Sequence, residues 1–175
     1  MNQRFLFIFS VLVLTMSSLF ISASYAENEA APEQMNPEKL RAAIEQYSTD
    51  ITVNNNVISF RYQNVTLYCI WDANADRMRI ITPIANLSDL EPELIVLALK
   101  ANYHTVLDAR YAIGDDILYS VFIHPLSPIT TAELESAIRQ VATAALTFGS
   151  SFTSGELVFP GNSAEPAGKK KVRTL

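Results

Sequence analysis

The chain has 175 residues, of which 49% are apolar, 10% aromatic and 18% charged, with 13 lysines and arginines against 18 aspartates and glutamates. This apolar content excludes a disordered chain, and the low charged fraction excludes a coiled coil or a nucleic-acid-binding module. A single cysteine excludes a disulfide framework and a cysteine-built metal site. The length fits one domain, since about 100–200 residues are typical. We therefore expect one compact acidic domain.

The first 26 residues have the pattern of a secretory signal peptide. Arg4 is the only charged residue before Glu27, and a long apolar stretch that begins at Phe5 separates the two. Ser24 and Ala26 place small residues at the −3 and −1 positions of a cleavage site. The alternative is an uncut membrane anchor, because about 20 apolar residues can span a bilayer. Cleavage after Ala26 would make the mature chain periplasmic or secreted, assuming a Gram-negative bacterial source.

The mature chain is expected to begin with a polar segment followed by a helix. Residues 27–36 are polar and small, and they are predicted to form a flexible leader. The helix is predicted to begin at Pro37, because Asn36 is a favourable N-cap and proline suits the first helical position. Apolar residues recur at helical spacing up to Tyr47. The three asparagines at 54–56 are expected to end this segment before the first strand.

Three runs with strand character follow, and they predict an antiparallel meander. The run at 57–62 alternates between apolar and polar residues, the run at 65–71 is rich in β-branched and aromatic residues, and the run at 77–84 alternates again. Asn64 and the polar stretch at 73–76 supply the turns.

The second half of the domain is predicted to begin with a helix and a hairpin. Ser88 and Glu91 have the spacing of a capping box before an apolar helix at 94–99. The runs at 110–113 and 117–123 are predicted to pair around a turn that contains glycine and aspartate.

A final helix completes the predicted domain. Thr130 and Glu133 form a second capping box, and Gly149 ends the amphipathic helix that follows. The resulting order is αβββαββα, one α+β domain at 37–159 with a five-stranded antiparallel sheet and helices packed on it. Residues 160–175 are predicted to form a disordered basic tail.

Candidate catalytic residues are few. His104, Asp108 and His124 are the only set that a hydrolase-type enzyme of unrecognised class could use, and they are too few for a typical zinc site. Cys69 lies within a predicted strand, whereas a catalytic cysteine needs a loop or helix N-terminus and a basic partner. The sequence contains no Gly-x-Ser-x-Gly, Cys-x-x-Cys or phosphate-binding glycine-rich motif. We therefore predict no catalytic residues, no metal and no cofactor, with the three-residue enzyme as the alternative.

The predicted sheet is apolar on both faces. Its helix side is expected to carry Phe60, Leu67, Trp71, Ile80, Tyr119 and Val121. The opposite face then carries the candidate protein-interface residues Tyr68, Ile70, Ile81, Leu118 and Phe122. Five large apolar side chains on a solvated face indicate an interface. The alternative is that a helix or the segment 152–159 covers this face from within the same chain.

Several segments resemble the type III secretion chaperone-like superfamily and the related YbjN-type family. They are Leu94-x2-Leu97-x-Leu99-x2-Asn102, Ala109-Arg110-Tyr111-Ala112-Ile113, Gly114-Asp115-Asp116 and Thr131-Ala132-Glu133-Leu134. The likeness covers about residues 37–148. It implies a twisted antiparallel sheet with packed helices, a homodimer formed through the sheet or the central helix, and binding of extended protein segments along apolar grooves.

These patterns together predict an exported, non-enzymatic protein-binding or chaperone-like module that acts as a dimer through an apolar sheet face. Its partner would be a protein or an extended peptide segment. A purely structural envelope protein is a further alternative. No nucleic-acid partner is expected, because residues 27–168 carry 8 basic and 18 acidic side chains. The tail residues Lys169–Lys171 and Arg173 could add at most weak contact with an anionic membrane surface.

Overall fold

The structure is a computed structural model, and it describes residues 34–48 and 50–155. The predicted signal peptide at 1–26, most of the predicted leader and the predicted basic tail lie outside the described residues.

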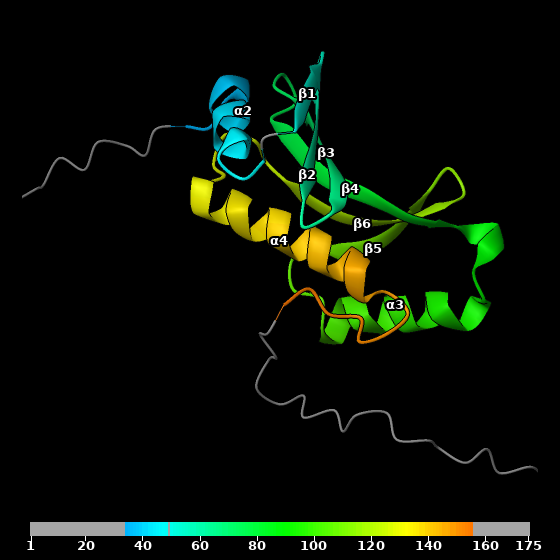
Figure 1. Cartoon of the computed structure of the whole chain (residues 1–175). Helices are drawn as coiled ribbons and strands as arrows, with labels where there is room; N and C mark the ends of the chain where they lie inside the picture. The colour runs from blue at the N-terminus through cyan, green and yellow to red at the C-terminus, as the bar shows by residue number, and fades with distance from the viewer. Residues whose placement is uncertain (1–33, 49, 156–175) are drawn as a thin grey trace, which may run out of the picture. The chain divides into compact units, whose positions relative to one another are not determined.

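The described residues form a single sheet, three α-helices and one short 3-10 helix (Figure 1). In chain order they are α2 (Pro37–Glu45), β1 (Ile51–Asn54), β2 (Val57–Tyr62), β3 (Val65–Asp72), β4 (Arg77–Asn86), η1 (Leu87–Asp89), α3 (Pro92–His104), β5 (Arg110–Gly114), β6 (Ile117–His124) and α4 (Thr131–Thr147).

The sheet is antiparallel throughout, with the strand order β1-β2-β3-β4-β6-β5. The predicted α+β class is confirmed, but the sheet has six strands and not five. The strand that the sequence did not predict is β1, which pairs with β2 from Ile51↔Phe60 to Asn54↔Val57. Its last three residues are exposed because it is an edge strand. An edge strand of four residues shows too little burial for alternation to reveal it.

Two hairpin turns fit their sequences closely. Gln63 and Asn64 join β2 to β3 with φ of 48° and 66°, and Asp115 and Asp116 join β5 to β6 with φ of 49° and 59°. Two consecutive residues of positive φ match the right-handed twist of paired strands. Asparagine and aspartate tolerate this conformation better than most residues.

The helix starts confirm two predictions and correct one. The Asn36 side chain accepts a hydrogen bond from the backbone N–H of Lys39 at 2.9 Å and caps α2. Thr130 and Glu133 form the predicted capping box of α4. The capping box expected at Ser88 does not form, because Ser88 lies in η1 and its hydroxyl bonds to Asp89 instead. Helix α3 therefore begins at Pro92 without a side-chain cap.

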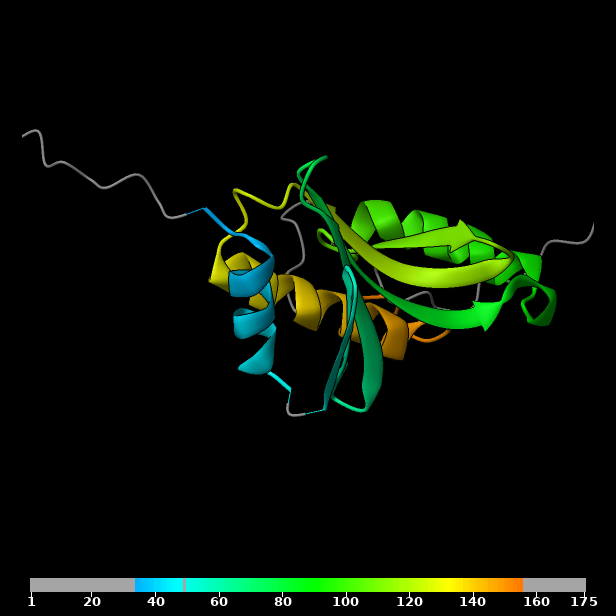
Figure 2. The ribbon, with the colours of Figure 1, turned by 90° about the horizontal axis from the view of Figure 1, so that it is seen from above.

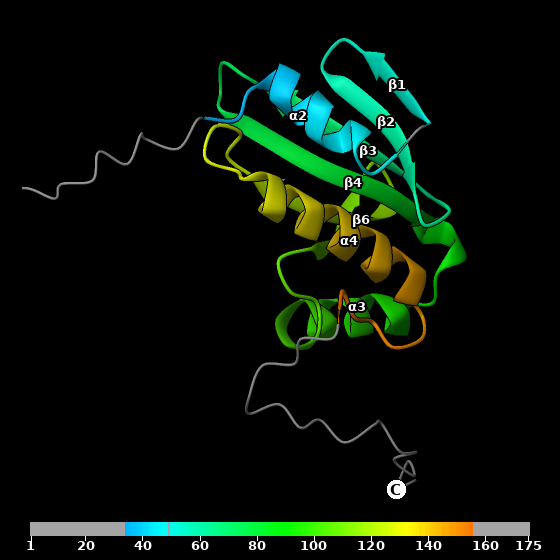
Figure 3. The ribbon, with the colours of Figure 1, turned by 60° about the vertical axis from the view of Figure 1, so that its left-hand side comes forward.

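Helices α2 and α4 lie on one face of the sheet, whereas α3 runs along its β5 edge (Figures 1, 2 and 3). The Asn102 side chain fixes α3 there. Its amide donates to the backbone oxygen of Tyr111 at 3.0 Å and accepts from the N–H of Tyr111 at 2.8 Å. An unpaired strand edge can bind another strand, so Asn102 protects the β5 edge at this point.

Candidate functional site

The two faces of the sheet follow directly from the strand register. Residues opposite each other on neighbouring strands share a face, and successive residues alternate. The row Ile58–Cys69–Ile80–Phe122 runs across four strands, and all four side chains are buried beneath α4. We call this face the core face.

The other face, which we call the open face, is defined by two neighbouring rows of side chains. The first row is Val57, Ile70, Arg79 and Ile123, and the second is Ser59, Tyr68, Ile81, Val121 and Arg110. Tyr68, Ile70 and Ile81 are partly exposed, and Ile123 is 61% exposed. Since α2 and α4 pack on the core face, this face is where large apolar side chains meet solvent.

The structure brings together three of the five predicted interface residues. Tyr68 and Ile81 are direct cross-strand partners, and Ile70 lies in the adjacent row. Leu118 and Phe122 are instead on the core face, where they are 1% and 8% exposed. Their predicted assignment to the open face is therefore wrong.

The error arises because β6 is apolar on both sides. Tyr119, Val121 and Ile123 alternate with Leu118 and Phe122 and lie on the open face, opposite to the prediction for Tyr119 and Val121. Alternation separates the two sets but does not say which set faces the helices. Ser120 lies on the same side of β6 as Leu118 and Phe122 and is fully buried. A small residue between two large ones is the one sequence feature that could have indicated the side on which a helix packs closely.

The chain segment after α4 does not extend over the open face as far as it is described. Thr105 donates to the backbone oxygen of Phe152, and the Ser154 hydroxyl accepts from the N–H of Leu107 at 2.7 Å. This segment therefore lies beside the α3–β5 loop. The part of the predicted covering segment beyond residue 155 lies outside the described residues.

A second apolar surface lies on α3. Val96, Leu97, Leu99 and Tyr103 are 50%, 44%, 62% and 83% exposed, while Ala98 and Ala101 are buried. Val96, Leu99 and Tyr103 are separated by three and four residues, so they share one side of the helix. The sequence predicted an apolar helix here but not which residues would be exposed.

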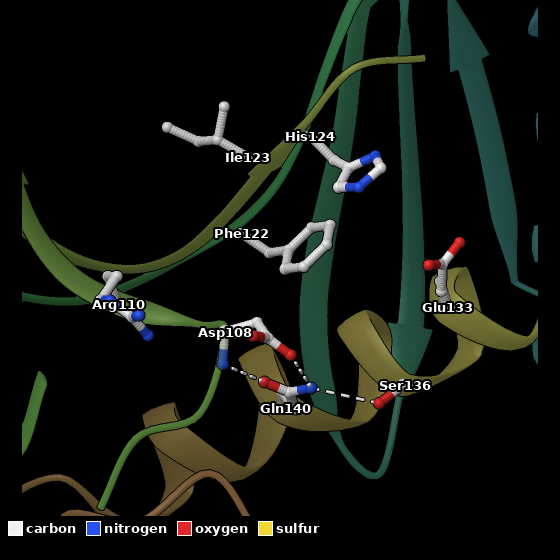
Figure 4. Close-up of a pocket in the computed structure, with 8 residues that line it drawn as sticks. All are labelled: Asp108, Arg110, Phe122, Ile123, His124, Glu133, Ser136 and Gln140. Carbon is white, nitrogen blue, oxygen red and sulfur yellow. Dashed lines mark hydrogen bonds between the residues drawn. The ribbon is translucent and has the colours of Figure 1, made fainter. Parts of the chain in front are cut away.

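A pocket of about 400 Å³ lies between α4 and the ends of β5 and β6 (Figure 4). Its lining residues are Asp108, Arg110, Phe122, Ile123, His124, Glu133, Ser136 and Gln140. Buried Gln140 organises it: its side-chain oxygen accepts from the N–H groups of Asp108 and Ala109, at 2.8 and 3.1 Å. Its amide nitrogen bonds to the Asp108 carboxylate at 3.2 Å and to the Ser136 hydroxyl at 3.1 Å.

The pocket contains two of the three residues of the enzyme hypothesis. Asp108 and His124 line it, but His104 lies at the end of α3 with its ring against Tyr103. The Asp108 carboxylate bonds to Gln140, and His124 Nδ1 lies 2.8 Å from the backbone oxygen of Pro125. The three side chains therefore do not converge on one reacting position.

The carboxylate of Glu133 is also committed to a structural contact. The backbone N–H and hydroxyl of Thr130 hydrogen-bond to it and lower its pKa. Among residues 34–48 and 50–155, no group of three or more histidine, cysteine, aspartate or glutamate side chains is arranged to hold a metal ion.

The cysteine is buried as predicted. Cys69 has no exposed surface, and burial raises the pKa of its thiol to about 12. A protonated, inaccessible thiol is a poor nucleophile, so Cys69 serves packing.

No family model matches the sequence, and no curated protein matches it. Three solved structures are similar to the fold: the HopA1–SchA chaperone–effector complex, the Yersinia pestis type III secretion chaperone SycH with a fragment of YscM2, and the ExsC–ExsE complex. Identities are 11%, 15% and 10%, with TM-scores of 0.48, 0.48 and 0.47. The similarity covers 64%, 64% and 61% of this chain and 88%, 95% and 86% of those chains.

SycH is a type III secretion chaperone, the class to which the sequence resemblance points. With TM-scores below 0.5, the similarities assign no partner or role to this chain. Separately, no helix among the described residues is long and apolar enough to cross a membrane.

Proposed function

We propose that this protein is a non-enzymatic, chaperone-like module that binds other polypeptides on its open face. The observation that carries the proposal is the pair of neighbouring rows in which Tyr68, Ile70, Ile81 and Ile123 remain partly or largely exposed. Contiguous exposed apolar patches on soluble domains mark interaction sites. A sheet face suits an extended or helical segment, because its rows of side chains form a broad surface.

We further propose that the protein acts as a homodimer through α3. Val96, Leu99 and Tyr103 form an apolar stripe along one side of this helix. A twofold axis would pack the stripe against its own copy, since such an interface pairs the same patch on both subunits. This arrangement leaves the open face available to a partner.

Export is the third part of the proposal. It depends on the signal-peptide pattern that ends at Ala26. Mass spectrometry of the envelope fraction should detect a mature chain that begins at Glu27. A chain that retains Met1 in the membrane pellet would instead indicate an uncut anchor.

Binding can be tested with a defined unfolded client, reduced and carboxymethylated α-lactalbumin, by fluorescence anisotropy. The Ile70→Ser/Ile123→Ser double variant should weaken binding at least about tenfold, because burying two large apolar side chains stabilises a complex by several kcal/mol. Val53→Ser is the matched control, since Val53 is 40% exposed on β1 and its pairing with Ile58 places it on the side of the core face. Equal losses in both variants, or no binding by the wild type, would contradict the proposal.

The dimer can be tested by light scattering after size-exclusion chromatography. Leu99→Lys should give a monomer with an unchanged circular dichroism spectrum, because Leu99 is 62% exposed in one copy but would be buried between two. Leu146→Lys should remain dimeric. A monomeric wild type at high concentration would rule out the dimer.

A further inference from the structure

The charged residues of the domain are distributed unequally between its surfaces. The strand residues of the open face include four arginines and one acidic residue, which are Arg61, Arg77, Arg79, Arg110 and Asp72. All four arginines are exposed. The rest of the stretch from 34 to 155 holds four basic and twelve acidic residues. The open face is thus a basic surface on an acidic domain.

The arginines are interleaved with the apolar side chains and do not form a separate patch. Arg79 lies directly between Ile70 and Ile123 in the first row, and Arg110 follows Val121 in the second. Neighbouring strands are about 4.8 Å apart, so each of these charges is one strand from an apolar side chain. A ligand that covers the apolar rows must also contact the guanidinium groups.

Three arginines of the open face, Arg61, Arg79 and Arg110, form no ion pair within the described part of the chain, whereas the charge of Arg77 helps to lower the pKa of Asp76. The ion pairs there join Arg41 to Glu45 and Arg139 to Glu135, both within helices. Arg77 and Arg110 donate hydrogen bonds only to backbone oxygens. Asp72, the one acid on the face, accepts two hydrogen bonds from the N–H groups of Asn74 and Ala75.

We propose that the open face binds an acidic amphipathic polypeptide segment, in which aspartate or glutamate alternates with large apolar residues. The inference rests on the proposed function and specifies the chemistry of the partner. Arginine pairs with carboxylates through two parallel hydrogen bonds, so the four arginines can select and orient such a segment. The acidic remainder of the domain repels the same segment, which directs it to this one face.

A polypeptide fits these observations better than a nucleic acid. Tyr68 and Tyr119 are the only aromatic rings among the described strand residues of this face, and the isoleucines and valines beside them offer no ring on which bases could stack. Stacking supplies much of the affinity for single strands. Phosphate backbones also require an extended basic surface, whereas residues 27–168 carry 8 basic and 18 acidic residues. Binding of an oligonucleotide is therefore an outcome that would overturn the proposal.

The test compares three fluorescein-labelled 12-residue peptides that alternate leucine with glutamate, glutamine or lysine, with the full-length mature chain as receptor. At low salt the glutamate peptide should bind at least about tenfold more tightly than the lysine peptide, and added salt should reduce this preference. Arg79→Gln should weaken binding of the glutamate peptide about fivefold, as expected for one partly desolvated charge pair. The matched control Arg139→Gln removes an exposed arginine on α4 and should leave binding unchanged.

The outcomes separate this inference from the proposed function. If all three peptides bind with equal affinity and the Ile70→Ser/Ile123→Ser variant loses this binding, the charge preference is overturned but the protein-binding role remains. Binding that Arg79→Gln does not change would also overturn it. If a single-stranded oligonucleotide or anionic phosphatidylglycerol vesicles bind more tightly than the glutamate peptide, and Arg79→Gln abolishes that binding, then the ligand of this face is not an acidic peptide. No binding of any peptide or of the unfolded client would refute both proposals.

Discussion

The core face and the open face of this sheet are built from similar strand residues but have different roles. On β6, Leu118 and Ile123 are both large and aliphatic, yet they are 1% and 61% exposed. Helix α4 covers the first and leaves the second in solvent. The hydrophobicity of a strand residue therefore does not decide its burial. The packing of the helices does.

The polar residues distinguish the two faces more clearly than the apolar ones do. On the core side, Gln140 satisfies its side-chain oxygen and nitrogen with two hydrogen bonds each. On the open face, Arg61 and Arg79 are exposed to solvent, and no ion pair within residues 34–155 engages either. A buried polar group must find partners within the fold, whereas an exposed charge remains available for a ligand.

The largest expected difference is between truncations on the two sides of β6. Leu118→Ala should reduce the free energy of unfolding by about 2–5 kcal/mol, because it leaves a cavity in a fully packed core. Ile123→Ala on the same strand should change it by no more than about 0.5 kcal/mol, since Ile123 is exposed. Urea unfolding followed by circular dichroism measures both. Similar values for the two variants would refute the face assignment.

The buried hydrogen bonds of Gln140 should give the next largest effect. Gln140→Leu preserves the size of the side chain but leaves the N–H groups of Asp108 and Ala109 without their acceptor. Each unsatisfied buried donor costs about 1–3 kcal/mol, so a clear loss of stability is expected. Gln46→Leu, at the exposed end of α2, is the control and should be nearly neutral. If Gln140→Leu leaves the free energy of unfolding unchanged, water must replace the lost acceptor.

The elements were largely predictable from local patterns, but the faces were not. Asn36, Thr130 and the Asp115-Asp116 turn act through contacts with residues close in sequence, and local sequence therefore predicts them. The face of β6 depends on which side α4 packs, and α4 follows β6 in the chain. The exposed edge strand β1 shows only weak alternation, so it was missed.

The candidate site was predictable only in part for the same reason. Tyr68 and Ile70 are two residues apart on one predicted strand, Ile81 lies on a strand that was predicted to alternate, and their common face was correctly inferred. Ile123 and the arginines join them only through the register of β4 with β6, which no local pattern specifies.

Lowering the pH should remove a smaller contribution that the Asp76 carboxylate makes to the free energy of unfolding. The backbone N–H of Ser127, and then its hydroxyl, hydrogen-bond to the Asp76 carboxylate and lower its pKa. A lowered folded-state pKa stabilises the fold above the unfolded-state pKa, and this contribution is lost as the pH falls through the folded value. The urea midpoint of the wild type should therefore fall more between pH 6 and pH 3 than that of Asp76→Asn. Ser127→Ala, which keeps the backbone donor, should behave more like the wild type. Parallel pH profiles for all three chains would contradict this account.

The smallest predicted effect is a gain in stability at one buried hydroxyl. Within the described residues, the Ser120 Oγ is the one buried side-chain polar atom without a hydrogen-bond partner. Ser120→Ala removes this uncompensated group without leaving a cavity, and it should raise the free energy of unfolding by up to about 1 kcal/mol. Thr82, its cross-strand partner, is the matched control, because its hydroxyl donates to the backbone oxygen of Thr66 at 2.8 Å. Thr82→Val should lose about 1 kcal/mol, so the two substitutions should change stability in opposite directions. If both variants lose stability, then the Ser120 hydroxyl has a hydrogen-bond partner, and water reaches the core face despite the packing of α4 against it.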